Sequence, residues 1–273
     1  MSVKTFAAID VGSFEISLKI VEFSGKNSSK VLEHIRKRIA LGGDTYVTGK
    51  INTERLDELC RTLKEFSGIM KTYKVSDYKA YGTSAIREAE NSKIILDQIE
   101  QRTGIKIDVL SNSEQRFLHY KAIAFTGESF QNVIKEGTAI VDIGGGSIQI
   151  SLFDKDMLVS TQNIKLGALR VQEWLHQMNI KSSQMENLVD EIASSQLNTY
   201  KKLYLKDSQI KTLIVVDDYL SLWIAGKTKA SGKEPMVSME EYEKFLGMLR
   251  NAPMQEVARK LSISEEAANL TAV

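Results

Sequence analysis

The chain has 273 residues, more than one hydrophobic core usually holds, so its length predicts two domains. Hydrophobic residues make up 42% and charged residues 26%, a composition that argues against an intrinsically disordered protein. The 36 basic and 35 acidic side chains leave a net charge of +1, which gives no overall field for attracting nucleic acid or a membrane. We therefore expect neither as a partner, and we expect any anion to be recognised locally.

Taken in chain order, the first half predicts three strands followed by alternating helices and strands. The strands have apolar or alternating runs, at 5–11, 14–23, 30–40, 78–84 and 105–111. The helices have apolar residues at helical spacing, over about 53–73, 91–101 and 114–125. Gly104 is the expected C-terminal cap of the second helix, and the basic trio Arg36, Lys37 and Arg38 is expected on the solvent face of the third strand.

The second half predicts the same order of elements. Its opening strands are expected at 138–142, 147–153 and 157–164. Helices follow at about 167–178 and 183–203, then a strand at 212–216 and a mostly helical remainder. We therefore expect an N-terminal domain at 1–126 and a C-terminal domain at 127–273.

Two similar segments open the two halves. AAIDVGSFEISL covers 7–18 and AIVDIGGGSIQISLFD covers 139–154, so Asp10-x-Gly12 returns as Asp142-x-Gly144. The second copy is interpreted as having a longer turn. Because the same segment opens each half of the chain, the repeat predicts two related α/β domains with one ligand cleft between them.

The glycine turns of this repeat indicate phosphate binding. Glycines expose consecutive backbone N–H groups that hold phosphate oxygens, and an aspartate beside them suits a bridging Mg²⁺. The alternative is a pair of tight hairpins without a ligand, which Gly12-Ser13 alone would favour. We expect a metal near Asp10 and Asp142, and phosphate contacts from Gly12, Ser13, Gly144, Gly145, Gly146 and Ser147.

These two segments, and others in order along the chain, resemble the exopolyphosphatase / guanosine pentaphosphate phosphatase (Ppx/GppA) family of the sugar kinase–Hsp70–actin superfamily. The other segments are RIALGGDTYVTGKINTERLDELCRTLKEF (38–66), GTSAIREAEN (82–91), VLSNSEQRF (109–117) and IKLGALRVQE (164–173). The resemblance implies two ribonuclease-H-like, actin-like ATPase domains, Mg²⁺, and attack by water on a terminal phosphoanhydride. It also implies polyphosphate or a guanosine polyphosphate as substrate, and it suggests a homodimer.

Arg87 lies where the family has an arginine, and the resemblance implies that it contacts phosphate. A guanidinium can hold two phosphate oxygens at once and stabilise charge in phosphoryl transfer. Thr83 and Ser84 precede it at a predicted helix start, where free N–H groups also favour anions. The alternative is a capped helix with Arg87 on the surface.

The resemblance breaks at the residues that would activate water. Gln115 and Gln149 stand where the family has glutamates, and an amide can orient water but cannot accept and keep a proton. Glu114 would face away from the spot that Gln115 occupies, because adjacent helical residues point in different directions. Glu15, on the first hairpin, is a second candidate to replace the lost glutamates.

Other departures affect the phosphate turns. Phe14 and Ser17 replace an asparagine and an arginine of the family in the first hairpin. After the strand at 212–216, Asp217 and Asp218 stand where the family has a glycine-rich turn, and two carboxylates there would repel phosphate; the alternative is a helix N-cap. Together, the departures predict a phosphoanhydride hydrolase with weak or lost activity, a pseudoenzyme. The alternative is a non-catalytic binding or regulatory module for a phosphorylated nucleotide or polyphosphate.

The remaining reactive residue types predict structural roles. Cys60 is the one cysteine, so no internal disulfide is possible, and its place in a helical pattern predicts a buried small hydrophobe. His34, His119 and His176 have no metal-ligand spacing and are expected to be hydrogen-bonded structural residues. The N-terminal run enters a strand without a signal-peptide core, so we expect a cytoplasmic protein.

Overall fold

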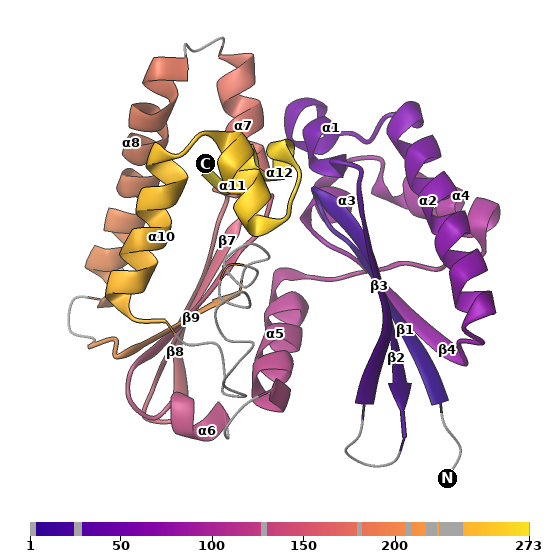
Figure 1. Cartoon of the computed structure of the whole chain (residues 1–273), viewed down its shortest axis with the longest axis horizontal. Coiled ribbons are helices and arrows are strands. Elements are labelled where there is room, and N and C mark those ends of the chain that lie inside the picture. The colour runs from indigo at the N-terminus through magenta and orange to yellow at the C-terminus, as the bar shows by residue number, and fades with distance from the viewer. Residues whose placement is uncertain are drawn as a thin grey trace. The chain divides into compact units, whose positions relative to one another are not determined.

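A computed structural model of the chain describes residues 4–24, 29–126, 130–178, 182–205, 209–216, 223 and 237–272. The chain divides into two compact units, Met1–Phe117 (unit 1) and Leu118–Val273 (unit 2). Each unit is a β-sheet with helices against it (Figure 1). The division falls inside a helix that ends at Thr126, and the domain boundary predicted at that end of the helix stays a prediction.

Unit 1 contains a five-stranded sheet in the order β3-β2-β1-β4-β5. The first three strands form an antiparallel meander, and β4 and β5 continue the sheet in parallel with β1. The predicted strands are confirmed, except that the one predicted at 105–111 is only two residues long. The strands are β1 Lys4–Val11, β2 Glu15–Phe23, β3 Ser29–Arg38, β4 Asp77–Gly82 and β5 Asp108–Val109.

Two short helices of unit 1, α1 and α3, were not located by the spacing of apolar residues. The side chain of Asn52 caps α2 by accepting a hydrogen bond from the backbone N–H of Arg55 at 2.8 Å. Gly104 ends α4 at a φ of 71°, which confirms the predicted cap. The helices are α1 Leu41–Thr48, α2 Thr53–Thr72, α3 Ser84–Glu88 and α4 Ser92–Thr103. α5 Asn112–Thr126 begins in unit 1 and continues into unit 2.

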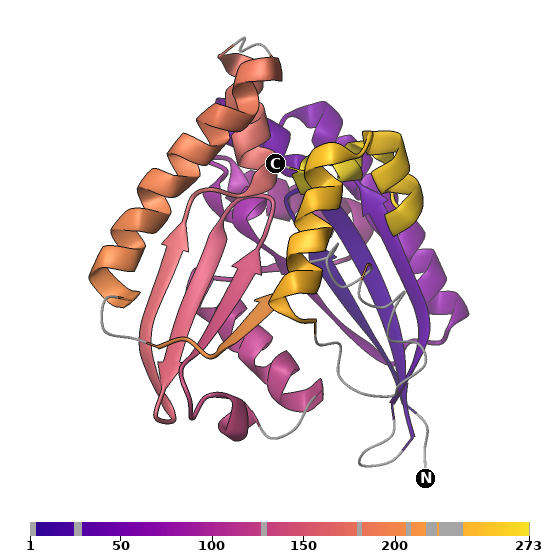
Figure 2. The same ribbon diagram turned by 60° about the vertical axis from the view of Figure 1, so that its left-hand side comes forward.

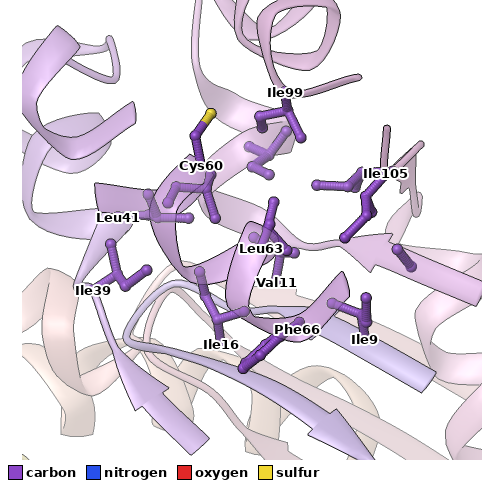
Figure 3. Close-up of a cluster of buried hydrophobic side chains, with 14 of the residues drawn as sticks. Ile9, Val11, Ile16, Ile39, Leu41, Cys60, Leu63, Phe66, Ile99 and Ile105 are labelled. Carbon is purple, nitrogen blue, oxygen red and sulfur yellow. The ribbon is translucent and has the colours of Figure 1, made fainter. Parts of the chain in front are cut away.

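The core of unit 1 lies between the sheet and the helices α2 and α4. Figure 3 shows Ile9 and Val11 of β1 close to Leu63 and Phe66 of α2. These side chains are at most 1% exposed, as alternate residues of a half-buried strand should be. Cys60 belongs to the same cluster and is 1% exposed, so the predicted role as a buried small hydrophobe is confirmed.

The expectation that the basic trio forms one solvent face is wrong. Successive residues of a strand point to opposite faces of the sheet, so three in a row cannot share one. Arg36 makes an ion pair with Glu15 at 2.6 Å. Lys37 instead contacts Glu65 of α2, and the guanidinium of Arg38 lies over the ring of Phe14.

Unit 2 contains a four-stranded sheet in the order β8-β7-β6-β9. β6, β7 and β8 form an antiparallel meander, and β9 is parallel to β6, so the first four strands of unit 1 recur in topology. All four predicted strands are confirmed. They are β6 Thr138–Ile143, β7 Ile148–Asp154, β8 Met157–Ile164 and β9 Thr212–Val216.

The helices of unit 2 differ from the prediction at α6, which was not predicted, and at the end of α8. The α-helix stops at Tyr200 and continues as a five-residue π-helix, η1 Lys201–Leu205. None of the described helices is long and apolar enough to cross a membrane. The helices are α6 Phe130–Val133, α7 Ala168–Gln177, α8 Ser182–Tyr200, α10 Met239–Asn251, α11 Met254–Leu261 and α12 Glu265–Ala272.

The sheet of unit 2 is covered on both faces. On one face, Ile150 and Leu152 pack against Tyr200 at the end of α8, which lies along the sheet in Figure 2. On the other face, Phe153 packs with Tyr120 of α5, whose ring lies 5.2 Å away in an edge-to-face arrangement. We call these the α8 face and the α5 face.

Candidate functional site

The two Asp-x-Gly hairpins have the same length, and the expectation of a longer second turn is wrong. Asp10 pairs with Ser17 across β1 and β2, and Asp142 pairs with Gln149 across β6 and β7. Each aspartate is therefore seven residues before its cross-strand partner. Ser13 and Phe14 of the first turn take the places of the second and third glycines of the second, Gly145 and Gly146.

The same backbone hydrogen bond closes both turns. Gly12 N–H donates to the carbonyl of Glu15, and Gly144 N–H donates to the carbonyl of Ser147, each at 3.0 Å. A Cβ on Gly12 would lie 2.7 Å from the Glu15 oxygen, so this position requires glycine. The turns thus share one backbone design, but only the second lacks side chains at both central positions.

The start of α7 holds the second turn in place. The backbone N–H of Arg170 donates to Gly145 O at 3.0 Å, and its guanidinium Nε donates to Gly146 O at 2.8 Å. Arg170 is 6% exposed, so these bonds are protected from water. Gly167 lies so close that a Cβ on it would be 2.3 Å from the Gly146 and Ser147 nitrogens. Both Gly167 and Arg170 belong to the sequence segment LGALR, but the residue types of that segment alone did not indicate these contacts with the turn.

Three oxygen-bearing side chains lie in a row next to the second turn. Asp142, Gln149 and Asn163 are cross-strand neighbours on β6, β7 and β8, so their side chains share the α5 face. Gln149 is 2% exposed. Its Oε1 and the Oδ1 of Asn163 are buried and have no hydrogen-bond partner among the described residues. Buried amide oxygens without a partner are costly, which indicates that a cation, water or ligand belongs beside them.

His119 contacts this row and was not predicted to lie near a site. Its Nδ1 is 3.3 Å from Asp142 Oδ2, and the Asp142 side chain is 13% exposed. His119 lies on α5, and the neighbouring Tyr120 donates its hydroxyl hydrogen to Ser151 Oγ at 2.6 Å, which fixes the helix on the sheet. The spacing of the histidines in sequence gave no signal, because the contact joins a helix to a strand that follows it.

The donor set fits Mg²⁺ better than a metal that needs several side-chain ligands. The described residues contain no cluster of three or more His, Cys, Asp or Glu able to hold a metal. Mg²⁺ prefers oxygen ligands, needs only one or two carboxylates, and keeps waters and phosphate oxygens in its shell. Asp142 with the amide oxygen of Gln149 meets that description, and Asp10 is its counterpart on β1.

Around the first turn, three hydroxyl groups bind one another. Ser13 Oγ lies 2.6 Å from the Tyr46 hydroxyl and 2.8 Å from Ser84 Oγ, and the last two are 2.9 Å apart. Ser13 and Ser84 are 6% and 7% exposed. Two of the expected phosphate ligands are therefore engaged with each other and with a tyrosine from α1.

Arg87 is also engaged within unit 1. Its Nη1 donates to the carbonyl of Leu110 at 2.6 Å. Burial lowers the pKa of the half-buried guanidinium, and Glu88 and Tyr46 partly oppose that shift. Thr83, at the start of α3, contacts the Val11 carbonyl rather than capping its helix. Arg87 is thus not the exposed surface residue of the alternative interpretation.

The two glutamates of unit 1 that were considered as substitute bases, Glu114 and Glu15, are both bound to other groups. Glu114 Oε2 accepts from the backbone N–H of Ser111 at 2.8 Å in a capping box, and these bonds to Ser111 lower the pKa of Glu114. Glu15 is held by Arg36 at 2.6 Å. Gln115 lies in the first turn of α5, where its backbone N–H donates to the Ser111 carbonyl.

The predicted site residues thus fall into two groups. Asp142, the turn 144–147 and Gln149 come together in unit 2, and the remaining predicted residues lie in unit 1. Asp217 and Asp218 fall outside the described residues, although β9 ends beside Asp142, which pairs with Val216. A cleft that joins the two groups stays a prediction.

Curated relatives carry phosphatase names. The chain is 28% identical over 169 residues to exopolyphosphatase 1 of Mycobacterium bovis, a match that covers 61% of this chain and 48% of the relative. It is 27% identical over 168 residues to the guanosine-5'-triphosphate,3'-diphosphate pyrophosphatase of Photobacterium profundum, covering 60% of this chain and 32% of that protein. In these matches the chain spans half or less of the relatives' length.

Solved structures share the fold. The crystal structure of the Aquifex aeolicus Ppx/GppA family member superimposes with a TM-score of 0.71 at 18% identity, covering 99% of this chain and 87% of that one. Both sheets and their helices therefore have the two-domain actin-like architecture of that protein. The family model for Ppx/GppA phosphatases matches residues 20–268, and the chain belongs to the Ppx/GppA phosphatase family.

Proposed function

We propose that the protein binds polyphosphate or a guanosine polyphosphate at its glycine turns with Mg²⁺, and hydrolyses the terminal phosphoanhydride only weakly. Family membership and the names of the relatives support the ligand class. The turn 144–147 supplies backbone N–H groups, and Arg170 engages two of its carbonyls, which removes acceptors that would repel phosphate.

One observation carries the proposal of weak hydrolysis. Gln149 lies next to Asp142 and is 2% exposed. It occupies the position where the family has a glutamate, which would act as general base toward the attacking water. An amide oxygen can orient a water molecule but cannot take its proton. Loss of a general base costs about 10²–10⁴-fold in rate. Glu114 and Glu15 are engaged elsewhere, so neither compensates.

Asp142 and Gln149 would hold the Mg²⁺, which would neutralise charge on the phosphate oxygens when bound. The proton from water must then leave to solvent or to a phosphate oxygen of the ligand. We further propose a homodimer, which the family resemblance suggests and light scattering of the intact chain tests. We also propose a cytoplasmic location, since a single cysteine fits a reducing compartment.

The test is phosphate release from polyphosphate and from pppGpp in Mg²⁺, comparing wild type with the double variant Gln115→Glu, Gln149→Glu. Because the variant restores carboxylates at both positions, we expect its rate to rise by at least about tenfold. Gln149→Met is the matched control: it keeps the volume, removes the oxygen and should bring no gain. Rapid turnover by the wild type would contradict the proposal.

A second candidate function is a non-catalytic binding or regulatory module. The hydroxyl cluster of Ser13, Tyr46 and Ser84 favours it, because these groups are already satisfied without a ligand. The two candidates differ in one measurement. If the double variant still releases no phosphate while calorimetry shows tight binding of either compound, the module is correct; binding of neither compound excludes both.

A further inference from the structure

A pocket of about 410 Å³ lies on the α8 face of unit 2, between β8, α7, α8 and η1. Its volume falls within the range of sites that bury a small molecule. It is separate from the row of Asp142 and Gln149, whose side chains lie on the opposite face of the same sheet.

Aromatic side chains form much of the wall. Trp174 comes from α7, and Tyr200 and Tyr204 come from the end of α8 and from η1, with ring centroids 5.1 Å apart and planes tilted by 36°. Flat faces of this kind offer stacking surfaces to a planar ring. Exposed Leu203 and Thr199 lie at the rim.

The polar groups of the wall are uncharged with one exception. Of the twelve lining residues, all within the described part of the chain, none is acidic and only Lys165 is basic. Gln162 Nε2 donates to the Tyr204 hydroxyl at 2.7 Å. The wall thus offers amides and hydroxyls, which suit the edge of a neutral heterocycle and not a phosphate chain.

Tyr200 contributes its ring to the wall rather than its hydroxyl. The residue is 6% exposed, its hydroxyl oxygen is buried, and the hydroxyl is hydrogen-bonded to Ser160. Burial raises the pKa of Tyr200, and the hydrogen bond with Ser160 only partly opposes this. Its ring is therefore held in place beside Tyr204.

The backbone of the wall is unusual as well. η1 is a π-helix, and such segments are rare and often occur at functional sites. Here it carries Leu203 and Tyr204 into the lining. An α-helix continued from α8 would place these two side chains differently, so the pocket depends on the π-turn.

We propose that this pocket binds a small, uncharged planar heterocycle of the nucleobase type. The ring stacks on the aromatic wall, and its edge bonds to the amides of the lining. The strand end that lines the pocket, Ile164–Leu166, runs directly into Gly167, which contacts the phosphate turn on Gly146. The pocket shares one residue, Asn163, with the row beside the second turn, and its other lining residues lie outside that row.

The test is an NMR titration of the intact chain with adenosine and with guanosine, following the indole N–H of Trp174. We expect a saturable shift with at least one nucleoside, and none with ribose 5-phosphate, which lacks the ring. Tyr204→Phe removes the hydroxyl that holds the Gln162 amide in the wall and should weaken binding about three- to tenfold. Tyr73→Phe, the same change at a partly buried tyrosine of unit 1 that is not among the lining residues, should leave the affinity unchanged.

A second variant keeps the proposal falsifiable if Tyr204→Phe folds poorly. Thr199→Trp adds a large side chain at an exposed rim position and should block the pocket while thermal unfolding stays as in wild type. No saturable shift with either nucleoside would overturn the proposal. Equal affinity in wild type and Thr199→Trp, or an equal Trp174 shift with ribose 5-phosphate, would overturn it as well.

Discussion

At the scale of single residues, the two turns differ in their side chains. The first turn carries a serine whose hydroxyl bonds to two other hydroxyls, whereas the second has glycines at both central positions. Ser13, Tyr46 and Ser84 can each donate one hydrogen bond and accept another, so the three hydroxyls can complete one another without water. This arrangement needed a tyrosine from α1, which lies more than thirty residues along the chain from Ser13. Residue types at the turn alone could not reveal it.

Removing the Tyr46 hydroxyl tests this cluster. Tyr46→Phe leaves the buried hydroxyls of Ser13 and Ser84 with one partner fewer, so the free energy of unfolding should fall by about 1 kcal/mol. Urea unfolding measures the change. Tyr73→Phe, where the lost partner is the solvent-accessible Glu33, is the control and should change little. Equal effects of the two substitutions would contradict a special role for the cluster.

Cys60 gives the protein a pH dependence of known sign. Burial raises the pKa of the thiol, with Arg102 partly opposing, so the folded state favours the protonated form. The resulting stability is present below the thiol's pKa in the unfolded chain and is lost as pH rises through its pKa in the folded chain. As pH rises above about 8.5, the ordinary pKa of a thiol, the free energy of unfolding should therefore decline, and less so in Cys60→Ala. Parallel urea-derived profiles for the two proteins would show that the thiol contributes nothing.

At the scale of elements, α1 shows why the sequence alone was insufficient. Its sequence, LGGDTYVT, contains two glycines and few apolar residues, so no periodic pattern indicates a helix. Hydrogen bonds from its entry to the first hairpin determine it: Ile39 and Ala40 N–H donate to Phe14 O, and Gly42 N–H donates to Ser13 O. A helix that is positioned by a distant turn cannot be identified from local propensity.

The contact between α7 and the second turn makes a matched pair of glycine substitutions informative. Gly167→Ala places a Cβ 2.3 Å from the backbone of Gly146 and Ser147, so the free energy of unfolding should fall by about 3 kcal/mol. Phosphate binding should weaken as well, because the turn must move. Chemical denaturation and calorimetry measure the two effects.

Gly247→Ala is the control in the same unit. That glycine lies inside α10 with no atom within 4 Å of an added Cβ, and the substitution should stabilise the protein by up to about 1 kcal/mol. If Gly167→Ala is tolerated as well as Gly247→Ala, the close packing of α7 on the turn is not required.

At the scale of the whole molecule, the strands and the repeat could be predicted because each rests on a local pattern, whereas the actin-like class came from the family resemblance. Alternating apolar residues located β1, β2, β7 and β8, and the recurring Asp-x-Gly located the hairpins. Other features depend on strand register and helix packing. These are the burial of Gln149 and Asn163, the contact of His119 with Asp142, and the hydrogen bonds of Arg170 to the second turn. These are non-local, and a single sequence carries no direct signal for them.

The equal length of the two hairpins has a consequence for the history of the chain. Matching register and matching closing bonds point to duplication of one ancestral half in which the turn already had this span. The two turns now differ only in what they carry: Ser13 and Phe14 in the first, Gly145 and Gly146 in the second. Superimposing the halves on each other should therefore align these loops without any gap.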